Sequence, residues 1–234
     1  MRAITQEEID EKVKAHKLWW DTNGKQGKRA VFRNVLITNK DFSHQNLRGA
    51  LFEDIRCTYT NFERTQLSSA RFKNVSFHQV KFRDANLINV TFLLCDITDT
   101  SYFYANLNTA TFTDTALIDV DFRSSNLNYT NFSTAKIKNI FVATATPMSV
   151  LGQRVICTQV NTSRRNNLIS YWADLGIWTT GCFQGTLEEL RERVAQKHEN
   201  NPFLRDRYER AINYILEEDK ADKEKGKERR KNEG

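Results

Sequence analysis

Residues 82–112, FRDANLINVTFLLCDITDTSYFYANLNTATF, place a large and mostly apolar residue at every fifth position. The same spacing extends in both directions from this stretch without a change of register. The large positions are Phe32, Ile37, Phe42, Leu47, Phe52, Cys57, Phe62, Leu67, Phe72, Phe77, Phe82, Leu87, Phe92, Ile97, Tyr102, Leu107, Phe112, Leu117, Phe122, Leu127, Phe132, Ile137 and Val142. Two residues before each lies a mostly small or β-branched residue, and Lys40 and Gln45 are the exceptions. A period of five fits neither a helix nor a strand, so the chain must turn every five residues.

A second period of twenty residues fixes the geometry of these turns. Phenylalanines recur at this spacing on one line, and leucines recur on another. The two lines are Phe32, Phe52, Phe72, Phe92, Phe112, Phe132 and Leu47, Leu67, Leu87, Leu107, Leu127. Like residues that recur every four turns predict a four-sided coil, in which each turn lies over the equivalent turn of the previous coil. The array predicts a solenoid of about six coils, given its twenty-residue period.

The residues of this array resemble a known family. AlaAsnLeu at 85–87 and 105–107, and ThrAsnPhe at 60–62 and 130–132, are similar to the A(D/N)LXX unit of pentapeptide-repeat proteins. The resemblance covers residues 30–144 and implies a right-handed four-sided β-helix, with the large residue and the small one before it both pointing inward. The expected fold is therefore mainly β, with an N-terminal capping helix and a small C-terminal α+β module.

The flanking segments predict caps for the open ends of such a coil. Thr5 and Glu8 have the spacing of a capping box, and Ile9, Val13 and Trp20 fall on one face of the helix that would follow. After residue 142 the rhythm fails, and Pro147 marks the expected exit. We therefore expect four segments. They are 1–29, the capping helix; 30–144, the β-helix; 145–219, the α+β cap; and 220–234, a charged tail that is frayed helix or disordered.

Within the C-terminal module, residues 153–184 alternate apolar and polar side chains, which predicts two or three strands. Thr186 and Glu189 form a second capping-box spacing, which predicts a helix to about His198. A further helix is expected to begin at Pro202. GlyCysPheGlnGlyThr at 181–186 resembles C-terminal pieces that follow pentapeptide arrays in bacterial and phage proteins.

Composition and spacing argue against several classes of protein. The chain of 234 residues is 39% hydrophobic and has no apolar run long enough to span a membrane, and its charged N-terminus does not resemble an export signal. Cys57, Cys95, Cys157 and Cys182 lie far apart, as expected of reduced thiols. We expect a cytoplasmic protein of bacterial or phage type that has no membrane association.

No motif for catalysis or cofactor binding stands out. The histidines have no recurring cysteine or carboxylate spacing, so we expect no metal site. The array has no phosphate-binding glycine loop, and we expect no cofactor. Cys182 follows Gly181, but no nucleophile–His–acid constellation is placed around it. The sequence therefore predicts a protein that is not an enzyme and has no catalytic residues.

Charge is unevenly distributed along the array. Residues 40–83 carry eight basic and four acidic side chains, whereas residues 84–135 carry one basic and six acidic side chains. A predicted acidic partner-binding surface in the second half comprises Asp96, Asp99, Asp114, Asp119 and Asp121. A solvated acidic surface without a partner is the equally weighted alternative.

Apolar residues at outward positions form a predicted apolar belt. It comprises Ile88, Leu93, Leu94, Phe103, Tyr104 and Ile118. Apolar side chains gathered on a surface mark a contact, and the candidates are a protein partner, a second copy in a homodimer, or the C-terminal module folded back. A separate polar series, Asn46, Gln66, Asn86, Asn106 and Asn126, predicts a hydrogen-bonding ladder along one side of the coil.

The family resemblance implies a function in binding. Some pentapeptide-repeat proteins bind DNA gyrase or topoisomerase IV by resembling a DNA duplex, but the net charge of +6 limits such DNA mimicry to the second half of this array. We expect a non-catalytic protein-interaction scaffold that engages a DNA-handling enzyme, such as a type II topoisomerase, or a host-defence component. The alternative is direct nucleic-acid binding through the basic first half, at Arg56, Arg64, Arg71, Lys73, Lys81 and Arg83.

Overall fold

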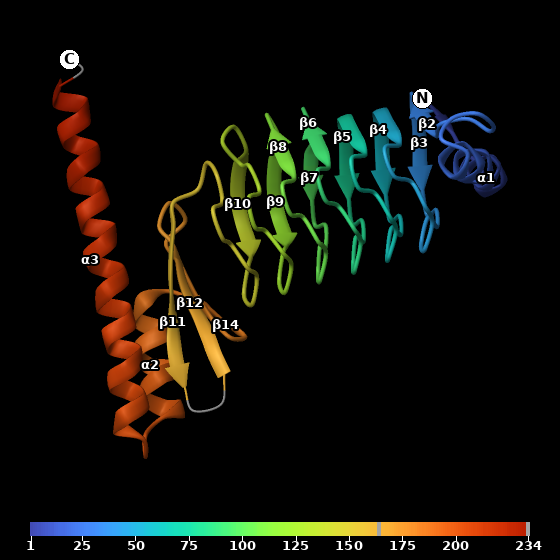
Figure 1. The fold of residues 1–234 in the computed structure, drawn as a ribbon. Helices are drawn as coiled ribbons and strands as arrows, with labels where there is room; N and C mark the ends of the chain where they lie inside the picture. Colours follow the sequence, from blue (N-terminus) through green and yellow to red (C-terminus); the bar gives the residue numbers. More distant parts are fainter. Residues whose placement is uncertain (163–164, 233–234) are drawn as a thin grey trace. The chain divides into compact units, whose positions relative to one another are not determined.

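The computed structural model describes residues 1–162 and 165–232, which divide into two compact units, Met1–Gly152 and Gln153–Gly234. The first unit is a solenoid of about six coils that begins with a short helix, and the second is a small α+β module (Figure 1). The expected mainly β class, with a pentapeptide-type β-helix, is therefore confirmed.

Ten short parallel strands form the solenoid. They are β1 (Arg2–Ala3), β2 (Val31–Arg33), β3 (Val35–Thr38), β4 (Leu51–Thr58), β5 (Arg71–His78), β6 (Thr91–Leu93), β7 (Asp96–Thr98), β8 (Thr111–Thr113), β9 (Ala116–Asp121) and β10 (Lys136–Phe141). Strand pairing keeps a register of twenty residues, so that Phe52 pairs with Phe72, and Phe72 pairs with Phe92. Isolated bridges such as Gln66↔Asn86 continue the same register on the other sides of the coil.

The coil has four faces, which are numbered in chain order. Face 1 contains residues 30–34 and the residues at twenty-residue spacing after them, and faces 2, 3 and 4 begin in the same way at residues 35, 40 and 45. On faces 3 and 4 the backbone N–H three residues after the large residue donates to its carbonyl, as from Ala105 to Tyr102 at 2.8 Å. These hydrogen-bonded turns bend the chain every five residues, as the period of five requires.

A continuous aromatic core fills the solenoid. The Phe92 ring lies 5.1 Å from the Phe72 ring and 4.7 Å from the Phe112 ring, and both pairs are nearly parallel. Rings from face 3, such as Phe82, meet these rings edge-on. The inward assignment of the large residues is confirmed over most of the array, because nearly all of them are less than 2% exposed; Ile137 in the last coils is half-buried.

The corner residue, two positions after each large residue, has a positive φ at almost every corner, for example 53° at Asn39 and 56° at Asp119. Asparagine, aspartate and glycine tolerate this left-handed conformation better than other residues do. This preference explains why Asn and Asp recur at the corners, a requirement that the five-residue pattern alone does not reveal.

Helix α1 (Gln6–Asp21) covers the first coil, next to β2 and β3 (Figure 1). Thr5 caps it, and the Thr5 and Glu8 side chains exchange the two hydrogen bonds of the predicted capping box. The buried residues of this face are Ile9, Val13 and His16, and Trp20, which was expected to join them, is not buried. Residue 20 lies eleven positions after residue 9, close to three full turns, so its angle matches this face; Trp20 nevertheless lies in the last turn of the helix and is 40% exposed.

The solenoid extends beyond its predicted end at residue 144. Bridges join Asn126 to Thr146 and Asn131 to Leu151, so the coil continues to the limit of the first unit at Gly152. Pro147 is buried and keeps the five-residue register, instead of marking the exit. At the equivalent position of each earlier coil the backbone N–H donates to the next coil, as from Leu127 to Thr146 at 3.0 Å; the last coil of this unit has no next coil, so a residue without an N–H fits there.

The second unit contains an antiparallel sheet and two helices. Its strands are β11 (Val155–Thr162), β12 (Arg165–Trp172), β13 (Ile177–Thr180) and β14 (Phe183–Gly185), one more than the largest number expected. Helix α2 (Leu187–Lys197) begins after its cap Thr186 and ends at His198, as predicted. The core joins residues of the sheet, such as Ile169 and Trp178, to Leu190 and Ile212 of the helices.

Helix α3 (Pro202–Asn232) begins at the predicted proline, but it is much longer than expected. The charged tail that was expected to be frayed or disordered is helical as far as Asn232. Its lysine, glutamate, arginine and alanine residues favour helix, and Lys223 pairs with Asp219 one turn earlier at 2.6 Å. Asp219 also accepts an ion pair from Arg154 at 2.8 Å, which ties this helix to the start of the sheet.

Candidate interaction surface

The five residues of the predicted acidic surface do not form one cluster. Asp99 and Asp119 occupy the same corner of successive coils, and Asp96 lies on the same face, face 2. Asp114 is a corner residue of face 1, and Asp121 lies on face 3. Because Asp99, Asp114 and Asp119 occupy positive-φ corners, the backbone supplies a reason for these aspartates that is independent of binding.

Neighbouring side chains partly compensate the acidic charges. The Asn139 side-chain amide donates to Asp119, and the His78 ring lies 3.4 Å from the Asp99 carboxylate. Arg123 donates two side-chain hydrogen bonds to Asp121, at 2.9 and 2.8 Å. Asp99, Asp119 and Asp121 line one shallow hollow, so the structure brings together three of the five predicted residues.

The six residues of the predicted apolar belt lie on all four faces and do not form a continuous belt. Leu93 and Leu94 lie on face 1, and Phe103 and Tyr104 lie on face 3. The others are isolated, with Ile118 on face 2 and Ile88 on face 4. Residues that are close in sequence diverge here because the chain turns through a corner every five residues.

Face 3 nevertheless brings aromatic side chains together with arginines. The Arg83 guanidinium lies 5.3 Å from the Phe103 ring centroid, and the Arg123 guanidinium lies 5.7 Å from the same centroid on the next coil. Arg123 also lies 5.9 Å from the Phe141 ring. These four residues, Arg83, Phe103, Arg123 and Phe141, alternate along the solenoid and are called the Arg–Phe ladder below. Cation–π contacts hold their planar groups against one another.

Tyr104 extends this surface at the corner beside the ladder. Its ring lies 4.4 Å from the Phe103 ring, and its side chain is 53% exposed. Its φ is 59°, a conformation that is costly for a bulky side chain. The corners Tyr59 and Tyr129 have the same conformation, so the coil imposes it, and Tyr104 differs from them in its contact with Phe103.

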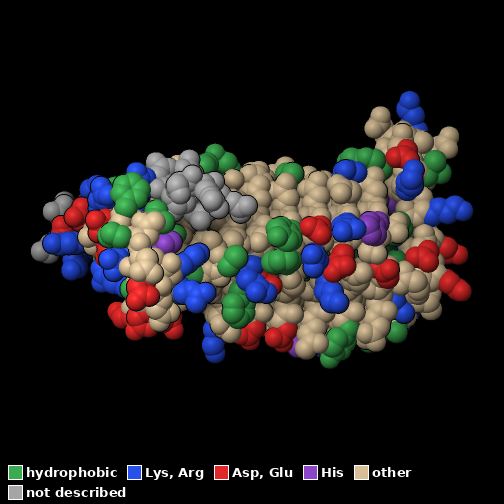
Figure 2. Space-filling view, turned by 90° about the horizontal axis from the view of Figure 1, so that it is seen from below, with side chains coloured by type: hydrophobic (Ala, Val, Ile, Leu, Met, Phe, Trp, Pro, Cys, Tyr) green, Lys and Arg blue, Asp and Glu red, His purple; other side chains and the backbone are tan. Residues whose placement is uncertain are grey.

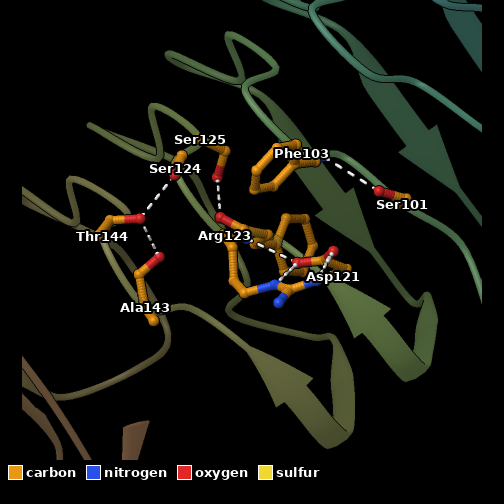
Figure 3. A network of polar contacts seen from close by, with 9 residues as sticks. Ser101, Phe103, Asp121, Arg123, Ser124, Ser125, Ala143 and Thr144 are labelled. Carbon is orange, nitrogen blue, oxygen red and sulfur yellow. Dashed lines mark hydrogen bonds and ion pairs between the residues drawn. The ribbon is translucent and has the colours of Figure 1, made fainter. Parts of the chain in front are cut away.

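The arginines of the ladder also contact carboxylates. Arg123 pairs with Asp121, as Figure 3 shows beside Phe103, and Arg83 lies 3.5 Å from Asp84. Hydrogen bonding to Asp121, together with the charge of that carboxylate, raises the pKa of Arg123 above its ordinary value. In Figure 2 charged and apolar side chains gather along one band of the solenoid, next to a band that is mostly uncharged. The ladder is therefore a mixed surface, in which positive charge is locally balanced.

Sequence reasoning missed the ladder, although its signal is present. Arg83, Phe103 and Arg123 are twenty residues apart, the period that stacks residues of one coil on the next. Aligning the outward positions at this spacing, as was done for the inward ones, places the three residues on one line. Phe141 lies two residues before the next position of that line, on the same face.

The basic residues of the first half are also divided among faces. Arg71 and Lys73 lie on face 1, and Arg56 lies on face 2, whereas Arg64, Lys81 and Arg83 lie on face 3. Lys73 pairs with Glu53 at 3.1 Å, and both Arg64 and Arg83 lie within 3.7 Å of Asp84. Carboxylates thus compensate three of the six residues.

The cysteines and histidines differ in their accessibility. Cys57 and Cys95 are buried in the solenoid, and burial raises the pKa of each thiol to about 12. Cys182 and His198 both line a cleft of the C-terminal module, where the His198 ring stacks on Tyr208. Within residues 1–162 and 165–232 no group of three or more metal-ligating side chains comes together, and no helix is long and apolar enough to cross a membrane.

Comparisons with known proteins concern the solenoid. A sequence profile described as "Pentapeptide repeat region" matches residues 26–102, and one described as "Pentapeptide repeats (8 copies)" matches residues 105–140. No curated protein matches the chain.

Several solved structures are similar in fold. One is QnrB1, a plasmid-mediated fluoroquinolone resistance protein, with 17% identity over 53% of this chain and 85% of that chain, at a TM-score of 0.31. AT2G44920 from the Arabidopsis thaliana thylakoid lumen has 21% identity over 47% of this chain and 63% of that chain, at a TM-score of 0.35, so the match spans less than two thirds of its length. HetL from Nostoc sp. strain PCC 7120 is involved in heterocyst differentiation regulation. It has 11% identity over 58% of this chain and 92% of that chain, at a TM-score of 0.19.

Proposed function

The chain belongs to the pentapeptide-repeat family, and on that premise we propose that it is a non-catalytic scaffold that binds a protein partner through the Arg–Phe ladder and Tyr104. The observation that carries this proposal is the pair of half-buried Phe103 and exposed Tyr104, whose ring centroids are 4.4 Å apart, with Phe103 set between arginines of the preceding and following coils. Aromatic residues and arginine dominate the energetically important centres of protein interfaces.

The regular backbone makes this surface suitable for binding. Strand pairing fixes successive coils, and the contacts of Phe103 with Arg83 and Arg123 order these long side chains before a partner arrives. Side chains that are already ordered lose less conformational entropy when they bind. Two shallow hollows flank the ladder, and the Arg123 side chain lines both of them.

A DNA-handling enzyme such as a type II topoisomerase, bound by partial DNA mimicry, is the narrower form of this proposal. It would depend on Asp96, Asp99 and Asp119 of face 2, because Asp121 is paired with Arg123 and Asp114 lies on another face. A host-defence component that binds the ladder is the other form. The two differ in salt dependence, because exposed carboxylates act through screened charge and the ladder acts largely through apolar contact.

Direct nucleic-acid binding is the alternative function. It is supported by Arg64, Lys81 and Arg83, which lie together on face 3. Glu63 and Asp84 share that face, and Asp84 lies within 3.7 Å of both arginines, which lowers the net positive charge available to phosphates. This balance favours a protein partner over a nucleic acid.

The experiment is affinity capture from a bacterial lysate with the intact chain and two variants, Tyr104→Asn and Tyr59→Asn. Both tyrosines are corner residues with positive φ, and they are 53% and 54% exposed, but Tyr59 lies on face 2. We expect a specific partner that Tyr104→Asn loses and Tyr59→Asn retains. Equal retention by both variants would reject the ladder as the binding surface.

Competing duplex DNA distinguishes the forms of the proposal. Displacement of the partner by DNA, together with loss of binding in Asp99→Asn/Asp119→Asn, would support mimicry. A partner that is indifferent to DNA and to these two changes would support the ladder. Direct retention of DNA by the isolated chain, weakened by Arg64→Ala/Lys81→Ala and by salt, would support the alternative function.

A further inference from the structure

Face 4 of the solenoid is almost without charge. It comprises residues 45–49, 65–69, 85–89, 105–109, 125–129 and 145–149, and Arg48 is its single charged residue. Charged residues make up 27% of the whole chain, so their near absence from this face of six successive coils is a marked departure. Face 3, by contrast, has several charged residues of each sign.

The polar groups of face 4 form part of the predicted ladder, because side-chain hydrogen bonds join two of its four successive pairs. The Asn86 side-chain amide donates to Gln66 at 3.1 Å, and the Asn126 amide donates to Asn106 at the same distance. Each asparagine oxygen also accepts the backbone N–H two residues later, as Asn126 does from Asn128 at 3.0 Å. These side chains are therefore fixed in place before any contact is made.

Apolar side chains stand at the far end of the same face. Tyr129 is 52% exposed at a corner with a φ of 58°, and Met148 on the following coil is 59% exposed. The Tyr129 backbone N–H donates to the Met148 carbonyl at 2.8 Å, which places these two residues on adjacent coils. Face 4 thus combines ordered amides with an exposed apolar end.

We propose that face 4 binds face 4 of a second copy of this chain, so that the protein is a twofold symmetric dimer. In such an interface each residue near the symmetry axis approaches its own copy, so a charged residue there would meet a like charge. Face 4 has no charged residue near its middle, because Arg48 lies in its first turn. Side-chain amides suit this contact because each one both donates and accepts, so identical arrays can pair with each other.

The position of the single charge sets the orientation of the two copies. Arg48 lies at the α1 end, with its guanidinium 5.8 Å from the Trp20 ring and donating to Gln66 at 2.9 Å. An antiparallel arrangement separates the two Arg48 side chains by the length of the face and brings each toward the Tyr129 end of the other copy. A parallel arrangement would place the like charges together. Antiparallel packing is therefore the expected form.

Sedimentation equilibrium of the intact chain tests this proposal. We expect a dimer at about 100 µM protein, with a dissociation constant that changes little between low and high salt because the interface is uncharged. Asn106→Lys places a like-charge pair near the symmetry axis and is expected to weaken the dimer at least about tenfold. High salt should recover part of this loss, because it screens the new repulsion.

The matched control is Thr111→Lys. Thr111 holds the equivalent position on the next turn of the same coil, is half-buried like Asn106, and lies on face 1. This variant should dimerise as the unchanged chain does. A monomeric chain at this concentration, or equal weakening by both lysines, overturns the proposal. The ladder variant Tyr104→Asn should leave the dimer intact, so failure of the proposed function and failure of this inference are separate outcomes.

Discussion

The Nδ1 atom of His16 accepts a hydrogen bond from the Ala30 backbone N–H at 3.0 Å, and this contact joins helix α1 to the first residue of the repeat array. The His16 side chain is fully buried. Burial lowers the pKa of His16 below its ordinary value of 6.5, the Arg29 charge lowers it further, and the Arg48 carbonyl partly offsets both effects. The neutral ring is therefore the form that holds the cap on the coil.

This contact predicts that the capped solenoid loses stability in mild acid. Because the folded-state pKa is below the unfolded value, His16 contributes fully above about pH 6.5, and the contribution falls as the pH decreases from there toward the folded-state pKa. The free energy of unfolding can change by up to about 1.4 kcal/mol per pH unit when one proton is taken up. Urea unfolding from pH 8 to 5 measures it. His16→Gln, whose amide oxygen can still accept the Ala30 N–H, should reduce the slope, and an unchanged slope would contradict the assignment.

Tyr102 should be replaceable by phenylalanine with a gain in stability. Its ring stacks between Phe82 and Phe122 inside the solenoid, and its buried hydroxyl has no hydrogen-bond partner among the described residues. Burial raises the pKa of this hydroxyl well above its ordinary value of 10. Removing an unsatisfied buried hydroxyl should stabilise the fold by about 1 kcal/mol. Thermal unfolding of Tyr102→Phe measures the change, and a loss of similar size would show that the hydroxyl is satisfied in solution.

The inward assignment predicts that Phe92→Asp prevents folding. Phe92 is fully buried between two parallel rings, and an unpaired carboxylate there would be costly. Phe92→Leu keeps an apolar side chain and should cost only about 1 kcal/mol. Circular dichroism of the two variants makes the comparison. An unchanged melting profile for Phe92→Asp would refute the inward position.

The sequence predicted much of this fold because periodicity records which residues are inward. The spacing of five identified the turns, the spacing of twenty identified the stack, and Thr5 and Thr186 marked the starts of two helices. Pro147 was misinterpreted because proline ends most regular elements, whereas in the last coil of the solenoid no following coil is there to accept a backbone N–H at this position. Trp20 has the angular position of the buried face, but it lies in the last turn of α1 and is exposed, which angular position alone does not reveal.

The outward surfaces were harder to predict, for a physical reason. An inward residue has one environment, the core, whereas an outward residue belongs to one of four faces that only the register separates. Ile88 and Leu94 were grouped because they are close in sequence. The chain turns a corner between them, so they lie on different faces of the coil. The positive φ at the corners also changes the meaning of Asp99 and Asp119, because Asp is favoured there by the backbone itself.

Corner strain predicts that Tyr104→Asn stabilises the protein. A bulky residue at a φ of 59° is strained, and asparagine relieves part of that strain. The expected gain is about 0.5 kcal/mol, and Tyr59→Asn, at a φ of 52°, should give a similar gain. Chemical denaturation of both variants measures it. If Tyr104→Asn alone destabilises, its contact with Phe103 contributes more than the strain costs.

Gly152 should tolerate substitution much less well than Gly49, although both have positive φ, 79° and 68°. A Cβ atom at residue 152 would lie 2.2 Å from the Ser133 Cα, whereas one at residue 49 would have no atom within 4 Å. Gly49→Ala therefore incurs only the left-handed backbone cost of about 1 kcal/mol. Gly152→Ala adds a clash with backbone that cannot move aside without opening the last coil, and its loss should exceed that of Gly49→Ala by at least about 1 kcal/mol. Urea denaturation of the two variants measures the difference, and equal losses would show that the end of the solenoid is not packed against Ser133.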